Sequence, residues 1–142
     1  MIKECVLISY VSGDEPLANL LKQAIEDCFV NVVQVHLLLE PNVLLEGSDW
    51  LKLLDSELYR CGVIIGVSDD HSINRITLEF ASWLADRRGT LFLSLRQGDD
   101  QLRVGGLINQ IAANFSFASP EFDAASFVDR AQRISSLEPI GV

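Results

Sequence analysis

The stretch Gly62-Val-Ile-Ile-Gly-Val-Ser68 (GVIIGVS) is a continuous apolar run that ends in a polar residue. Such a run predicts a strand that is covered on both faces, because a strand with one solvated face would alternate apolar and polar side chains. Residues 5–9 and 90–95 show the same pattern, and residues 32–39 form another expected strand. A weaker fifth strand is expected near residues 115–118.

Helical periodicity separates these expected strands. Apolar side chains recur at helical spacing over residues 17–28, 50–58, 76–84 and 127–134, and a short helix is expected over residues 107–114. Asp14 or Glu15 is placed to cap the first helix, with Pro16 in its first turn, and Ser119-Pro120 opens the last. Strands that alternate with helices predict an α/β fold. We expect a flavodoxin-like three-layer sandwich with a central parallel sheet of about five strands and helices on both faces.

Length and composition predict one globular domain over residues 1–142, since 49% of the residues are hydrophobic and no linker or repeat divides the chain. The formal net charge of -9 disfavours nucleic acid or an anionic membrane as a partner. No signal peptide or membrane-spanning run is evident, and the three widely spaced cysteines are expected to be reduced core thiols. These features predict a cytoplasmic protein.

In a parallel sheet the ligand crevice lies beyond the carboxyl ends of the strands, so the loops after the strands should carry the function. None of them contains a phosphate-binding loop or a GxSxG nucleophile motif. His36 and His71 have no partner at metal-ligand spacing, so no metal site is expected. Two features remain: the aliphatic residues 43–45 in a loop, and Glu79 at the border of an apolar helix stripe.

Three segments, in order, resemble a Toll/interleukin receptor (TIR) domain. They are CVLISYVSGDEPLANLLKQAI from Cys5, LLLEPNVLLEGSDWLKLLDSEL from Leu37 and GVIIGVSDDHSINRITLEFASW from Gly62. The first is similar to the opening strand, "SY" and amphipathic helix of that family. The second is similar to the strand, BB loop and leucine-rich helix, and the third to an apolar strand followed by a helix with one glutamate. The resemblance runs from about residue 3 to residue 96.

The resemblance implies cleavage of NAD+ between nicotinamide and ribose, with Glu79 as the catalytic carboxylate and NAD+ as substrate rather than cofactor. It also implies self-association through the BB loop, residues 40–47. The residues expected to line the nucleotide site are Tyr10, Ser12, Gly13, Asp14, Glu40, Trp50 and Trp83. Those expected in the self-association loop are Val43, Leu44, Leu45 and Gly47.

A single carboxylate is chemically adequate for this reaction. Nicotinamide already carries positive charge in NAD+ and leaves as a neutral base, so the general acid of ordinary glycoside hydrolysis is not required. The carboxylate can hold the ribose hydroxyls and stabilise the oxocarbenium charge as it develops. The resemblance thus implies an NAD+ glycohydrolase that forms ADP-ribose or a cyclic product, and an effector role in immunity or antiphage defence under a fused or separate sensor.

Alternatives remain at each of these positions. Arg75 and Glu79 stand four residues apart, which also fits a surface ion pair. Trp50 and Trp83 fit core anchors, which is the commoner role for such residues, and Tyr10 fits either role. Active bacterial members of the family often carry Trp where this chain has Arg75, and a basic or histidine residue where it has Val11. A TIR-type interaction or adaptor module without catalysis is therefore the alternative function.

Overall fold

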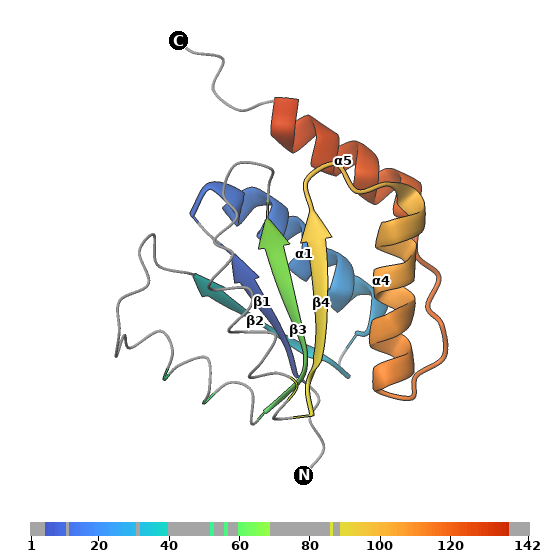
Figure 1. Cartoon of the computed structure of the whole chain (residues 1–142). Coiled ribbons are helices and arrows are strands. Elements are labelled where there is room, and N and C mark those ends of the chain that lie inside the picture. The colour runs from blue at the N-terminus through green and yellow to red at the C-terminus, as the bar shows by residue number, and fades with distance from the viewer. Residues whose placement is uncertain are drawn as a thin grey trace.

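A computed structural model describes residues 5–10, 12–30, 32–39, 60–68 and 89–136, together with positions 52, 56 and 86. In chain order its elements are β1 (Cys5–Tyr10), the 3-10 helix η1 (Ser12–Asp14), α1 (Glu15–Cys28), β2 (Gln34–Leu39), β3 (Cys61–Ser68), β4 (Leu91–Arg96), α4 (Gln101–Asn114) and α5 (Ala124–Ser136). Figure 1 shows the strands side by side with their arrowheads at one edge.

The described strands form one parallel sheet of four strands in the order β2-β1-β3-β4. This confirms the predicted α/β fold, and the order is the one found in flavodoxin-like proteins. β1 and β3 are the central pair, and their core residues Val6, Ile8, Val63 and Ile65 are each 0% exposed. The continuous apolar runs therefore form strands because the centre of the sheet has no solvated face for polar side chains.

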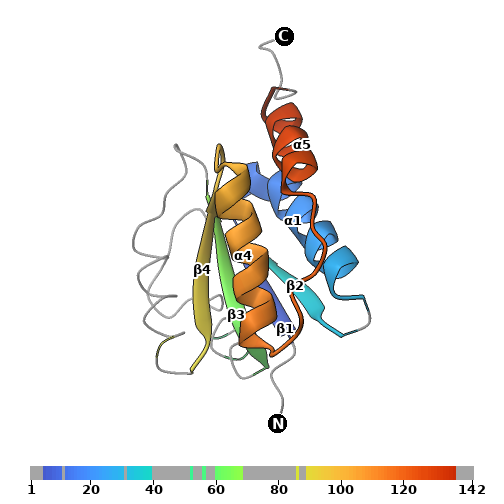
Figure 2. The same cartoon turned by 90° about the vertical axis from the view of Figure 1, so that its right-hand side faces the viewer.

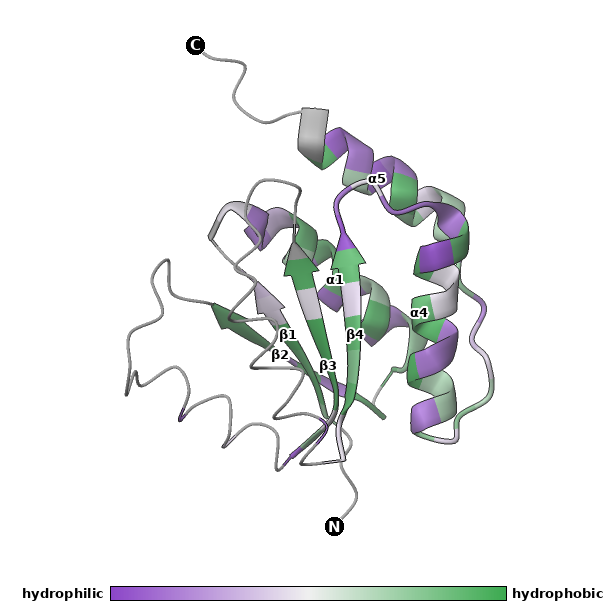
Figure 3. Cartoon of the chain, in the orientation of Figure 1, coloured by the Kyte–Doolittle hydropathy of each residue, from purple (hydrophilic) through white to green (hydrophobic). Residues whose placement is uncertain are grey.

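One layer of helices covers one face of this sheet. Figure 2 shows α1, α4 and α5 together on the same side. In Figure 3 the strands are mostly green, while the helices alternate between green and purple along their length. Apolar residues of α1 and α4, such as Leu21, Ile25 and Ile108, pack on alternate residues of the strands. The helices thus bury one stripe and expose the rest.

The opposite face of the two central strands is also buried. Leu7 and Ile64 alternate with the residues that contact the helices, and they are only 1% and 0% exposed. Of the helices that the sequence predicts over residues 50–58 and 76–84, the structure describes only positions 52 and 56, and both are helical. None of the described helices is long and apolar enough to span a lipid bilayer.

The expected fifth strand near residues 115–118 is not formed, and the sheet of the described residues has four strands. These residues instead end α4 in a Schellman motif. The Ser116 N–H donates to the Ala113 carbonyl and the Phe117 N–H to the Ala112 carbonyl, with Ser116 at φ +59°. The Phe117 ring then lies 6.0 Å from the ring of Phe29, centroid to centroid. The alternating pattern Phe115-Ser116-Phe117 is therefore part of the C-terminal cap of α4 and not of a strand.

Two helix boundaries also differ from the sequence prediction. α4 begins at Gln101, well before residue 107, because Asp100 caps it by accepting a hydrogen bond from the Arg103 N–H at 2.9 Å. α5 begins at Ala124 rather than near residue 120, and the Asp123 carboxylate accepts a hydrogen bond from the Ser126 N–H at 3.0 Å. In both helices a side-chain cap determined the start, and the apolar periodicity did not reveal it.

Ser116 occupies a left-handed position that glycine adopts without a steric penalty. We expect Ser116→Gly to raise the free energy of unfolding by about 0.5–1 kcal/mol, measured by urea denaturation. Ser119→Gly is the matched control, because Ser119 is an exposed loop residue without a positive φ, and it should give no gain. A Ser116→Gly protein less stable than the wild type would contradict the Schellman assignment.

Candidate functional site at the carboxyl edge of the sheet

The carboxyl ends of β1 and β3 form a topological switch point. From β1 the chain passes to β2 on one side, whereas β3 lies on the other side of β1. Crossover connections that leave in opposite directions open a crevice at this edge, which is where open parallel sheets bind ligands. The register puts Tyr10 opposite Leu39 and Ser68 opposite Arg96, so the ends of all the described strands meet at one edge.

The segment after β1 turns directly into a helix at this edge. η1 (Ser12–Asp14) leads into α1, whose N-terminal backbone N–H groups and partial positive charge favour an anionic group. A Cβ at Gly13 would meet no atom within 4 Å, so the chain is open to solvent there. The structure therefore brings three predicted site residues, Ser12, Gly13 and Asp14, to the switch point.

Asp14 is a buried acidic residue. It is 4% exposed and is the N-cap of α1, yet its side chain makes no capping hydrogen bond. Asp14 instead makes a hydrogen bond, ion pair or electrostatic interaction elsewhere in the protein. A buried carboxylate is costly unless it is paired or hydrogen-bonded. Interactions other than the local helix start therefore stabilise the buried position of Asp14.

Tyr10 lies at the same edge but belongs to the core. Its side chain is 8% exposed and packs with Val6 and Ile8 on the side of the helices. Only a small part of the ring surface is open to a ligand in this arrangement. The sequence left open whether Tyr10 is a core residue or a surface on which a ligand ring stacks. Its burial favours the core residue.

Arg96 is a cation at the same edge that the sequence analysis did not select. It ends β4, its side chain is exposed, and its N–H donates to the Asp99 carboxylate at 2.9 Å across the turn that contains Gly98 at φ +92°. A guanidinium suits phosphate oxygens, which it can bind in a bidentate manner. The sequence does show an arginine directly after a buried strand. Only the register of β3 with β4 shows that this arginine lies beside Ser68 at the edge of the candidate site.

The other predicted site residues lie outside the described residues. This applies to Glu79 with its neighbour Arg75. It applies equally to Glu40, Trp50 and Trp83, and to the loop residues Val43, Leu44, Leu45 and Gly47. Among the described residues, no three His, Cys, Asp or Glu side chains are placed to hold a metal ion.

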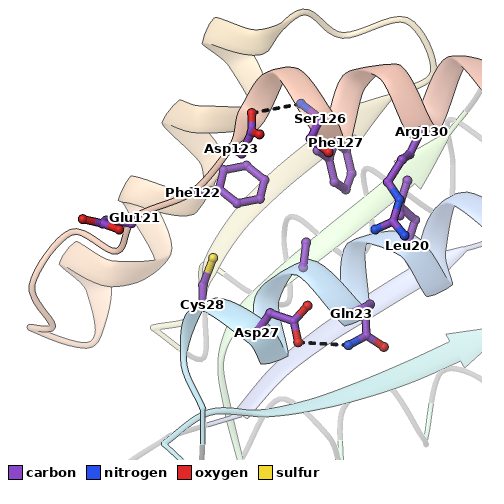
Figure 4. Close-up of a pocket in the computed structure, with 11 residues that line it drawn as sticks. Leu20, Gln23, Asp27, Cys28, Glu121, Phe122, Asp123, Ser126, Phe127 and Arg130 are labelled. Atoms are coloured by element: carbon purple, nitrogen blue, oxygen red, sulfur yellow. Dashed lines mark hydrogen bonds between the residues drawn. The ribbon is translucent and has the colours of Figure 1, made fainter.

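A separate groove of about 190 Å³ lies between α1 and the start of α5. Figure 4 shows side chains from the two helices facing each other across it. Phe122, half-buried, and Phe127, 5% exposed, line it beside the half-buried Cys28. Burial raises the pKa of the Cys28 thiol, and the nearby Asp27 carboxylate raises the pKa further, so the thiol is neutral at pH 7. These features describe a contact between helices that lacks an activated nucleophile.

A second groove, of about 460 Å³, lies between α4 and the outer edge of β4. Phe92 and Ser94 line it from the strand, and Leu102 lines it from the helix. Leu102 is 84% exposed, more than the other exposed large hydrophobic residues Val30, Val32 and Leu39. In the described sheet β4 pairs only with β3, so the outer edge of β4 has no described partner strand. An open strand edge with apolar neighbours is a surface suited to association.

No family model matches the chain, and no curated protein matches it.

We predict that Asp27→Asn speeds alkylation of Cys28 by iodoacetamide at pH 8. Removing the negative charge lowers the thiol pKa, which increases the thiolate fraction at that pH. Mass spectrometry of the Cys28 peptide measures the rate. Asp129→Asn is the control, because Asp129 pairs with Arg133 on α5, and it should leave the rate unchanged. An Asp27→Asn rate equal to that of the wild type would mean that Asp27 does not affect the thiol.

Proposed function

We propose that this chain is a TIR-type NAD+ glycohydrolase that becomes active when copies associate. The observation that carries the proposal is the switch point of the β2-β1-β3-β4 sheet. Segments that resemble TIR motifs meet there, since the Ser12–Asp14 turn and Ser68 belong to the first and third of them. The third of these segments also contains Glu79.

This edge carries the carboxylates of Asp14 and Glu15 as well as groups that favour anions, and the latter support binding of a dinucleotide. The N-terminus of α1 and the exposed Arg96 both favour anions, and the pyrophosphate of NAD+ carries negative charge. Between β1 and β4 lies a single strand, so the ends of these two strands stand about 10 Å apart across the edge, at about 4.8 Å per strand. In this proposal the pyrophosphate binds the Arg96 guanidinium, and the rest of the dinucleotide extends along this edge.

The proposed chemistry needs a carboxylate and a water molecule. The Glu79 carboxylate holds the ribose hydroxyls of the nicotinamide nucleoside and stabilises positive charge on that ribose as the glycosidic bond breaks. Nicotinamide leaves neutral, and water adds to the ribose with loss of one proton, which gives ADP-ribose. Attack by an atom of the adenine ring in place of water would give a cyclic product. Such turnover would deplete NAD+ and suits an effector domain in antiphage defence or other immunity, under a fused or separate sensor.

Self-association is supported by surface features of the described residues. Leu102 is 84% exposed beside the outer edge of β4. We propose that copies of the chain contact one another through TIR–TIR contacts that involve residues 40–47. The resemblance suggests that this loop of one copy helps to complete the site of another.

A non-catalytic TIR-type adaptor is the second candidate. The buried position of Tyr10 favours it, because a ring that is 8% exposed offers little stacking surface to nicotinamide or adenine. In this case the same contacts between copies would recruit another TIR domain, and Glu79 would be a surface residue paired with Arg75. Turnover distinguishes the two functions, whereas assembly is common to both.

We expect wild-type protein at high concentration, with a crowding agent, to release nicotinamide from NAD+, and Glu79→Gln to reduce this release at least about a hundredfold. Chromatography measures nicotinamide, and light scattering measures assembly. Glu121→Gln is the control: it removes an exposed carboxylate in the groove between α1 and α5 and should retain full activity. Assembly without turnover in the wild type would favour the adaptor, and turnover that survives in Glu79→Gln would remove Glu79 from its role.

Arg96→Gln should raise the KM for NAD+ about tenfold and change kcat little, because a guanidinium on the pyrophosphate acts on binding rather than on bond cleavage. Steady-state kinetics of nicotinamide release measure both constants. Arg130→Gln, which removes an exposed guanidinium on α5, should change neither constant. A loss confined to kcat would place Arg96 outside the pyrophosphate site.

A further inference from the structure

Two cysteines that are far apart in the sequence are neighbours in the sheet. Cys5 is the first residue of β1 and Cys61 the first residue of β3, and the register pairs them directly. They are 5% and 0% exposed, and neither belongs to the apolar cluster beneath the helices. Sequence patterns did not indicate this pairing, because spacing along the chain does not determine strand order.

The spacing between adjacent strands is suitable for a disulfide. Neighbouring strands lie about 4.7–4.9 Å apart, and paired residues of a disulfide have Cα atoms about 4.4–6.8 Å apart. All the cysteines are present as thiols in this structure. Cys28, on α1, is the third and lies in the groove that faces α5.

The backbone around Cys61 is held in an irregular conformation. The register shifts between Cys5 and Val6, so that Cys61 and Gly62 both fall opposite the one residue Cys5. The Thr90 hydroxyl donates to the Cys61 carbonyl at 3.1 Å, and the Asn114 amide donates to the Gly62 carbonyl at 3.3 Å. These bonds hold the bulge in place at the position where Cys5 and Cys61 are paired in the sheet.

We propose that Cys5 and Cys61 are an oxidisable dithiol that hydrogen peroxide converts to an intramolecular disulfide between β1 and β3. The inference rests on the sheet register and is independent of the proposed NAD+ chemistry. The disulfide would join the two central strands at their amino ends, at the edge of the sheet opposite to the candidate site.

The oxidation balances in two steps. One thiol loses its proton, and its sulfur attacks peroxide, so that an S–O bond forms and the O–O bond breaks, with release of water and formation of a sulfenic acid. The second thiol then attacks that sulfur, so that the S–S bond forms and the S–O bond breaks, with release of a second water molecule. In total, peroxide accepts two electrons and two protons from the pair.

Cys5 and Cys61 are buried, so peroxide reaches them only when the strand ends, where both residues stand, open locally. The terminal residues of a strand open locally at a lower free energy than the centre of a sheet. Reaction should therefore occur in the folded protein, at a slower rate than for an exposed thiol. Once formed, the link closes a loop of more than fifty residues, restricts the unfolded chain, and should raise the unfolding temperature.

The test uses the full chain with Cys28→Ser, so that Cys5 and Cys61 are the remaining thiols. After treatment with hydrogen peroxide under native conditions, non-reducing digestion and mass spectrometry should show a peptide pair joined through these two cysteines. The unfolding midpoint should rise by several degrees and return after reduction by dithiothreitol. Cys28→Ser with Cys61→Ser is the control and should show no intramolecular link and no rise.

Differential alkylation of the wild-type chain makes the same test without depending on a variant. The proposal requires both Cys5 and Cys61 to become protected together after peroxide and to become reactive again after reduction. Single oxidation products at either residue, links between molecules, or two thiols that stay reduced while Cys28 is oxidised would each overturn it. NAD+ turnover is measured in parallel, and its absence would count against the proposed enzyme without affecting this result.

Discussion

The pairing of β1 with β3 is the constraint on which the rest of the structure depends. Both strands lie inside the sheet, and their side chains are buried on both faces, with Leu7 at 1% and Ile64 at 0% exposure. A polar side chain in the middle of either strand would lose its hydration without a partner. Polar residues are therefore displaced to the strand ends, where the candidate site lies at one edge and the cysteine pair at the other.

The helical layer depends on this arrangement. α1, α4 and α5 cover one face of the sheet, and their apolar stripes meet alternate residues of the strands. The start and end points of the helices in this layer depend on capping residues as much as on apolar periodicity. Asp100 and Asp123 determine where α4 and α5 begin, and the turn at Ser116 directs Phe117 onto Phe29 at the end of α1. The last part of the chain is thereby tied to the first helix.

The functional proposal combines two kinds of support. The sequence contributes motifs that resemble a TIR domain, including Glu79, and the chemistry of NAD+ requires only one carboxylate. The fold contributes a switch point with a helix N-terminus, the buried Asp14 and the exposed Arg96 at one edge. The buried ring of Tyr10 favours the adaptor function, because it offers a nucleotide ring less stacking surface than the resemblance to TIR enzymes implies.

The sequence by itself determined the fold class and most of the strands. Short continuous apolar runs indicate buried strands. Helical periodicity between them makes a parallel sheet the simplest arrangement. The sequence also indicated that residues 12–14 directly follow the first strand, which the structure shows, whereas their role in lining a nucleotide site stays a prediction. The prediction of a strand at Phe115 and Phe117 was wrong. The alternating pattern is typical of a strand, but these residues form the end of α4 and pack on Phe29.

Tertiary structure alone decided which residues are neighbours across the sheet. The pairing of Cys5 with Cys61, the position of Arg96 beside Ser68 and the burial of Asp14 and Tyr10 all depend on strand order and register. The physical reason is that hydrogen bonds between strands join residues that are distant along the chain. Local patterns specify that a segment is a strand, but only the packing of the whole sheet specifies which strand lies beside it.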